Sequence, residues 1–73
     1  MEKKIINTSN SPAPIGPYNQ AILKGNTLFI SGQIALDAET MKLNNKSIND
    51  ETHQVMQNLK NILEEANMNF NDV

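Results

Sequence analysis

Apolar and polar residues alternate in two neighbouring stretches of the chain, residues 18–23 and 27–34. A period of two residues is typical of a β-strand with one buried face. Gly25 and Asn26 stand between the two stretches, and this dipeptide suits the two-residue loop of a hairpin. The pattern therefore predicts a β-hairpin within residues 15–34.

Weaker patterns flank this hairpin. Residues 3–7 are an apolar-centred run that predicts a first strand at the edge of a sheet. Residues 8–14 contain two prolines and four polar turn-forming residues, which predict a loop. Residues 36–43 predict a turn with an apolar residue on each side, and residues 44–46 continue that loop.

The C-terminal third of the chain predicts one long amphipathic helix. Six apolar residues recur at helical spacing and form a single stripe: Val55, Met56, Leu59, Ile62, Leu63 and Ala66. Ser47 is expected to cap the start of the helix, where Asp50 and Glu51 complement the helix dipole. Asn67 is expected to take the left-handed conformation that ends it. Met56 is expected to fill space in the core.

The order of elements predicts the fold class. Residues 69–72 are expected to form a loop, and Val73 is expected to begin another strand. Three strands followed by a helix predict an α+β fold in which the helix covers one face of a sheet. A chain of 73 residues makes one domain or part of one. Because the sequence has no cysteine for disulfides, oligomerisation is the expected source of additional stability.

Composition argues against several classes of protein. No run of 18 apolar residues occurs, and the N-terminus lacks the apolar segment of a signal peptide, so a cytoplasmic protein without a membrane span is expected. A net charge of −2, with six lysines and no arginine, predicts no nucleic-acid-binding face. One histidine and no cysteine predict no metal site.

Three groups of ionisable side chains are candidates for catalysis but have simpler explanations. His53 falls on the side of the predicted helix away from the apolar stripe, so we expect a solvated residue. Asp50 and Glu51 form one carboxylate pair, and Glu64 and Glu65 form another. Adjacent helix positions do not face each other, so both pairs are expected to be surface charges.

Tyr18, Ser31 and Gly32 form a more specific candidate site. If the two-residue loop closes the hairpin, Gln20 lies opposite Ser31, and Tyr18 is the diagonal neighbour of Ser31 on the same face. A phenol, a hydroxyl and a glycine backbone in one place can hydrogen-bond a small polar ligand or polarise a carbonyl or imine. The alternative is a buried tyrosine with its hydroxyl satisfied and a glycine at a β-bulge, and spacing alone favours that alternative.

The chain resembles the N-terminal half of the Rid (reactive intermediate deaminase) family, also called the YjgF or liver perchloric-acid-soluble protein family. Four stretches carry the resemblance in the family's order and spacing: residues 13–21 (APIGPYNQA), 25–34 (GNTLFISGQI), 36–40 (LDAET) and 54–60 (QVMQNLK). The resemblance implies that residues 1–73 are the N-terminal portion of a single Rid-family domain. It implies a chorismate-mutase-like α+β fold, here the N-terminal strands and the first helix, in a homotrimer with clefts between subunits.

The resemblance also implies a function. Enamine/imine deaminases of this family hydrolyse 2-imino acids, such as 2-iminobutanoate and 2-iminopropanoate, to 2-oxo acids and ammonia without a metal or cofactor. Tyr18, Ser31 and Gly32 match the family's substrate-cleft positions, which reverses the preference that spacing alone gave. The family's carboxylate-binding arginine and its general acid–base glutamate belong to the C-terminal half.

Two alternatives to the deaminase stay open. The first is a non-catalytic module that binds a small metabolite or another subunit. The second is the endoribonuclease or translation-inhibitor activity associated with the family, against which the acidic balance and the absence of arginine argue.

Overall fold

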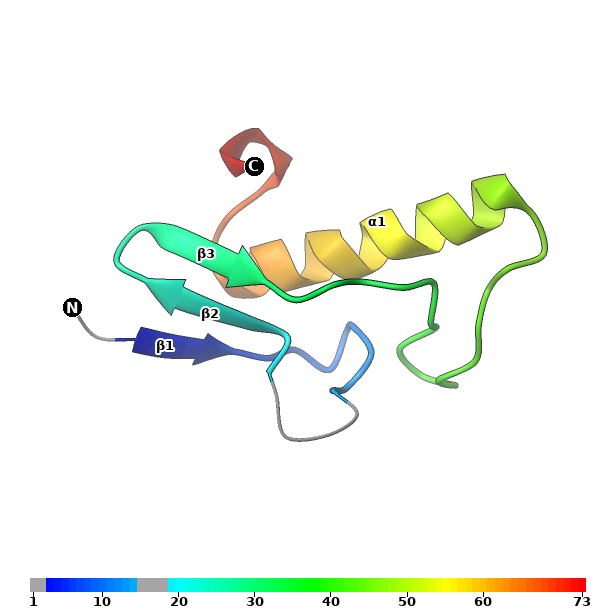
Figure 1. Cartoon of the computed structure of the whole chain (residues 1–73), viewed down its shortest axis with the longest axis horizontal. Helices are drawn as coiled ribbons and strands as arrows, with labels where there is room; N and C mark the ends of the chain where they lie inside the picture. The colour runs from blue at the N-terminus through cyan, green and yellow to red at the C-terminus, as the bar shows by residue number, and fades with distance from the viewer. Residues whose placement is uncertain (1–2, 15–18) are drawn as a thin grey trace.

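The computed structural model describes residues 3–14 and 19–73. In this part of the chain the elements are β1 (Lys3–Ile6), β2 (Ala21–Lys24), β3 (Thr27–Ile30), α1 (Ile48–Glu65) and the 3₁₀ helix η1 (Phe70–Asp72). The strands form one antiparallel sheet in the order β1-β2-β3. Figure 1 shows α1 running along one side of this sheet, which confirms the predicted α+β arrangement.

The hairpin between β2 and β3 has the predicted loop and register. Lys24 lies opposite Thr27, so Gly25 and Asn26 form the two-residue connection. Gly25 has a φ of 62°, in the left-handed region that a glycine adopts without a steric penalty. On the other side of β2, the predicted first strand β1 pairs through Ile6 and Ala21 at the end of its ladder.

Strand β2 is shorter than predicted. It begins at Ala21, and the preceding backbone is held by side chains instead of by a strand ladder. The Gln20 N–H donates to Asn7 Oδ1 at 2.9 Å, and Asn7 Nδ2 donates to Asn19 Oδ1 at 3.1 Å. Tyr18, the first residue of the predicted strand, lies outside the described residues.

Strand β3 also ends early, at Ile30 instead of Ile34. The Ser31 N–H still donates to Gln20 O at 3.0 Å, which extends the predicted register by one pair. Beyond it, the Leu36 N–H donates to Ile34 O at 2.9 Å and closes a tight turn. This turn breaks the alternation. The pattern placed Ile34 on the core face with Ile30, but Ile34 is 60% exposed, so that prediction is wrong.

The apolar core lies between the sheet and the C-terminal half of α1. Its buried cluster consists of Ile6 and Ala21 from the sheet and Ile62 and Ala66 from the end of the helix. Four partly buried residues pack against this cluster: Leu23, Leu28, Ile30 and Met68. On the opposite face of β3, Phe29 is 64% exposed, as the alternation predicts.

Helix α1 begins and ends where the sequence predicts. The Asp50 N–H donates to Ser47 Oγ at 3.1 Å, and Asn67 has a φ of 59°. Met56 is 44% exposed, so its predicted place in the core is wrong. Figure 1 shows the reason, because the N-terminal half of α1 extends beyond the strands. Within residues 3–14 and 19–73, no helix has both the length and the apolar character to cross a membrane.

The segment after α1 differs from the prediction. A 3₁₀ helix, η1, occupies residues predicted to form a loop, and it is closed by reciprocal caps. The Asn71 N–H donates to Asn69 Oδ1 at 2.8 Å, and the Asn69 N–H donates to Asp72 Oδ2 at 2.9 Å. Val73 is 85% exposed and its N–H donates to Phe70 O, which closes this turn, and the strand expected from Val73 onward stays a prediction.

Replacing Ile62 by alanine tests the position of the core. Ile62 is fully buried between α1 and the sheet, so Ile62→Ala is expected to lower the free energy of unfolding by about 2–5 kcal/mol. Met56→Ala on the same helix is the control, and its effect is expected to stay below about 1 kcal/mol. Urea denaturation followed by circular dichroism measures both, and equal losses would contradict the described packing.

Candidate functional site

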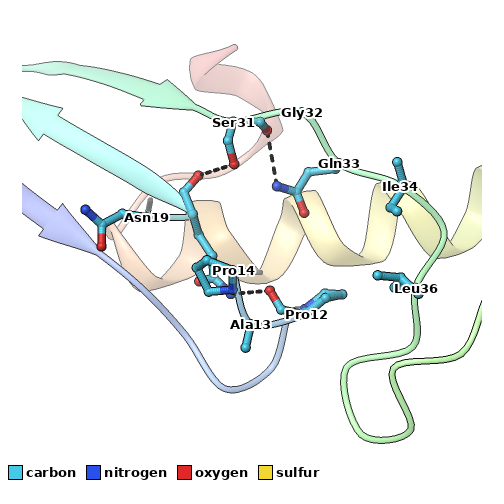
Figure 2. Close-up of a pocket in the computed structure, with 10 residues that line it drawn as sticks. Pro12, Ala13, Pro14, Asn19, Ser31, Gly32, Gln33, Ile34 and Leu36 are labelled. Carbon is cyan, nitrogen blue, oxygen red and sulfur yellow. Dashed lines mark hydrogen bonds between the residues drawn. The ribbon is translucent and has the colours of Figure 1, made fainter. Parts of the chain in front are cut away.

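A pocket of about 280 Å³ opens beside the end of β3. Its lining comes from three segments of the chain: Pro12, Ala13 and Pro14; Asn19 and Gln20; and Ser31, Gly32, Gln33, Ile34 and Leu36. Figure 2 shows residues 31–33 on one side and residues 12–14 on the other, with Ile34 and Leu36 toward one end. None of these lining residues carries a charge.

Ser31 lies in the wall that follows β3, with its hydroxyl and its backbone both engaged. Its Oγ donates to Gln20 O at 3.0 Å, and its carbonyl accepts from Gln33 Nε2 at 3.1 Å, as Figure 2 shows. The hydroxyl hydrogen is therefore used in the bond to Gln20 O. The oxygen keeps lone pairs with which it can accept a hydrogen bond from a ligand or a water.

Gly32 presents open backbone to the pocket. A Cβ added to it would have no atom of the described residues within 4 Å, so no group in residues 3–14 and 19–73 requires a glycine there. The Ser31 N–H donates to Gln20 O, and successive N–H groups of extended backbone point to opposite sides, so the Gly32 N–H is expected to point away from Gln20. Among the described residues this N–H has no acceptor.

The structure therefore brings two of the three predicted site residues together. Ser31 and Gly32 are neighbours in the pocket wall, and Gln20 lies opposite Ser31, as the hairpin register predicts. Tyr18, the third, lies outside the described residues.

The sequence interpretation missed a set of buried polar side chains around this pocket. Gln20 is 3% exposed, and its side chain holds the loop before it. Its Nε2 donates to the carbonyls of Thr8 (3.0 Å), Ser11 (3.2 Å) and Pro12 (2.8 Å). Its Oε1 accepts from the Thr8 N–H at 2.6 Å. This one amide therefore replaces a strand ladder for a segment whose prolines lack N–H groups.

Asn58 is the second buried amide, and it is 1% exposed on α1. Its Nδ2 donates to Ile34 O at 3.1 Å and to Leu36 O at 2.9 Å. A sequence signal for it existed, because Asn58 stands three residues after Val55 and four before Ile62, which places it on the apolar stripe. A polar residue at such a position needs internal partners.

The other candidate side chains lie away from the pocket. His53 is exposed, as are the four carboxylates that form adjacent pairs on α1, and none of them lines the pocket. Glu64 is 3.9 Å from Lys60 in an exposed i,i+4 ion pair, which contributes little to stability. Within the described parts of the chain, no three histidine, aspartate or glutamate side chains come together as a group that could hold a metal.

Comparison with known proteins decides the family. Residues 8–73 match the family model described as Endoribonuclease L-PSP. A RutC family protein of Pyrococcus horikoshii is 52% identical over 71 residues, which cover 97% of this chain and 56% of the relative. The chain belongs to the Rid (YjgF) family. Among its Rid relatives, a protein of Dermatophagoides farinae named 2-iminobutanoate/2-iminopropanoate deaminase is 41% identical over 71 residues, with the same coverage of 97% and 56%.

A solved structure confirms the Rid fold. The Rid protein YyfA of Yersinia pestis superposes with a TM-score of 0.90 at 38% identity, covering 94% of this chain and 55% of that one. The chain thus has a YjgF-type α+β fold. It spans about half the length of the curated relatives it matches.

Replacing Gln20 by leucine tests the polar support of the pocket. Gln20→Leu leaves the Thr8 N–H and three carbonyls without partners, so we expect a loss of about 2–4 kcal/mol in the free energy of unfolding. Gln57→Leu is the control, since the Gln57 side chain is exposed and bonds only Asn61. The midpoints of urea unfolding of the two variants are compared. A Gln20→Leu protein that is as stable as Gln57→Leu would contradict the role of the Gln20 amide in holding the loop.

Proposed function

We propose that residues 1–73 are the N-terminal portion of a single Rid-family domain, and that the complete domain hydrolyses reactive 2-imino acids to 2-oxo acids and ammonia. The observation that carries the proposal is the neutral pocket in whose wall Ser31 and the open backbone of Gly32 stand side by side. The mite relative named for this reaction supports the same substrate class, 2-iminobutanoate and 2-iminopropanoate.

The size of the pocket favours a small metabolite. Its volume of about 280 Å³ is just below the usual range for ligand pockets, roughly 300–1,000 Å³. Hydrogen-bonding groups and apolar groups both line it, which suits an acid with a short aliphatic side chain. A polymer would need an extended groove instead.

The reaction needs little from the protein besides positioning. Water adds to the carbon of a protonated imine and forms a carbinolamine. Its C–N bond then breaks, so the carbon keeps the oxygen of water as the 2-oxo group and the nitrogen leaves as ammonia. Holding the substrate, orienting the water and moving a proton are sufficient for this chemistry.

Each site residue has a defined role in this proposal. The Gly32 N–H, which is expected to point away from Gln20, donates to an oxygen of the substrate. Ser31 Oγ donates its hydrogen bond to Gln20 O, so its oxygen accepts a hydrogen bond from the attacking water or from the imine N–H. Tyr18 is assigned to the same cleft by its match to the family's motif, where its phenol contacts the substrate or its water.

The substrate carboxylate requires a cation that this pocket lining does not contain. The lining is neutral, and the sequence has no arginine. Under the proposal, the arginine and the general acid–base glutamate come from the part of the domain that corresponds to the second half of the relatives. Lysine is a poor replacement for a bidentate arginine.

A homotrimer with clefts between subunits completes the proposal. Ile5 and Phe29 lie on the face of the sheet opposite α1 and are 56% and 64% exposed. Ile22 stands between them in the strand register. Apolar residues gathered on one exposed sheet face favour a subunit interface over contact with water. A cytoplasmic location is part of the same proposal.

RNA cleavage is the second candidate, and the name of the matching family model is the observation that favours it. The charge balance opposes it, because the chain has a net charge of −2 and no arginine with which to hold phosphates. Cleavage of an RNA substrate that persists through stringent purification would support this candidate over the deaminase. A non-catalytic module would instead bind 2-oxobutanoate or a Rid subunit without releasing ammonia.

Ammonia release tests the deaminase directly. The complete protein that carries residues 1–73 is expected to accelerate ammonia release from 2-iminobutanoate generated immediately before the assay. A coupled glutamate dehydrogenase assay measures the ammonia. A rate equal to that in buffer would contradict the proposed function.

Two glycine variants separate function from stability. Gly32→Ala is expected to lower kcat/KM by roughly tenfold to a hundredfold, because the new methyl group displaces the substrate from the Gly32 N–H. It is expected to change the free energy of unfolding by less than about 1 kcal/mol, since no atom in the described part of the chain lies within 4 Å of that methyl group.

Gly25→Ala is the matched control. Gly25 has a φ of 62°, so alanine there should cost about 1–2 kcal/mol of stability while kcat/KM is unchanged. Urea denaturation and the ammonia assay are run on both variants. The same activity in both would argue against a role of Gly32 at the substrate.

A further inference from the structure

Asn58 contacts the pocket wall that follows β3. After Ser31 this segment belongs to no strand. Among the described residues it has an isolated β-bridge between Leu36 and Leu43, and its backbone is held by few bonds. The Leu36 N–H donates to Ile34 O at 2.9 Å, and the Asn44 N–H donates to Ala35 O at 2.7 Å. The remaining two bonds come from Asn58 Nδ2, on the carbonyls at either side of the buried Ala35.

The Asn58 backbone also contacts Ser11, the residue that precedes the opposite wall. Ser11 is 2% exposed, and its Oγ donates to Asn58 O at 2.6 Å across 47 residues of sequence. Ser11 directly precedes Pro12, and residues 12–14 line the other side of the pocket. Asn58 therefore bonds the wall that follows β3 with its side chain, and it bonds Ser11, beside the other wall, with its carbonyl.

The orientation of the Asn58 amide is fixed. Its Oδ1 accepts from Gln54 Nε2 at 3.0 Å, one helical turn earlier on α1, while both hydrogens of Nδ2 are used on the wall. A flipped amide would direct an oxygen at two carbonyl oxygens and lose both bonds. Only a side chain that donates two hydrogens from this position provides a hydrogen bond to both carbonyl oxygens of the wall.

We propose that Asn58 is a positioning residue that sets the separation of the two pocket walls, and hence the affinity for the substrate. The inference rests on the proposed function only in naming a 2-imino acid as the occupant. Asn58 does not line the pocket, so it acts through Ile34 and Leu36 on one side and through Ser11 on the other.

Asn58→Asp tests the side-chain contact in the complete protein. Aspartate has nearly the same shape, but it replaces the two donor hydrogens by an acceptor facing two carbonyls. The exchange of the Leu36 and Asn44 amide hydrogens, followed by NMR, is expected to become at least about tenfold faster. KM for 2-iminobutanoate is expected to rise by roughly tenfold with kcat changing far less, because the wall binds the substrate and supplies no proton.

Asn61→Asp is the matched control. Asn61 lies three residues further along the same helix, and its Nδ2 donates to Asn10 O at 2.6 Å, a carbonyl outside the pocket lining. The substitution, the charge and the loss of a donor are the same. In this variant the exchange rate of the Leu36 amide hydrogen and the value of KM are both expected to match those of the unchanged protein.

Ser11→Ala tests the second wall and serves if Asn58→Asp does not fold. It removes only the bond to Asn58 O, and KM is expected to rise about threefold. If the unchanged protein releases no ammonia, the proposed function fails, while the exchange rates of Leu36 and Asn44 still test Asn58. Exchange rates and KM values that are the same in Asn58→Asp, Ser11→Ala and Asn61→Asp would overturn the inference.

Discussion

The buried amide of Asn58 is the constraint on which the pocket wall that follows β3 depends. A polar group removed from water and left unpaired costs roughly 1–3 kcal/mol, so an amide that is 1% exposed must find a partner for each hydrogen and for its oxygen. Asn58 finds them in two carbonyls of the wall and in Gln54. The position of α1 and the conformation of residues 34–36 are therefore coupled.

The apolar core and the polar contacts have different roles in this structure. The core cluster of Ile6, Ala21, Ile62 and Ala66 joins the helix to the sheet and sets the two layers. It does not specify the loops, because apolar contact is not directional. The directional bonds of Gln20 and Asn58 specify them, and both amides act on backbone that lacks a strand partner.

The neutral pocket relates the fold to the proposed reaction. Its described lining offers an open N–H at Gly32 and an accepting oxygen at Ser31, which suit a polar ligand without a net charge at that wall. A 2-imino acid also has a carboxylate, and a carboxylate in a pocket needs a cation. A chain that spans 56% of the length of its relatives is thus proposed to form one wall of a cleft, with the cation on the other.

Local sequence patterns determined the elements that depend on local chemistry. Gly25 and Asn26 specified the hairpin loop and its register, and the apolar stripe with Ser47 and Asn67 specified α1 and its ends. The register in turn placed Gln20 opposite Ser31. The motifs of residues 13–60 also identified the family correctly.

Only the tertiary structure decided where the strands end and what holds the pocket. The start of β2 and the burial of Asn58 depend on hydrogen bonds between side chains and distant backbone, whereas the exposure of Ile34 depends on the local turn closed by the Leu36 N–H. The bonds of Asn58 join residues 24 and 47 positions apart. The apolar stripe can indicate that Asn58 is buried, but it does not show which distant backbone groups this side chain bonds. Periodicity records which face is apolar, and the folded chain alone decides which polar groups that face must satisfy.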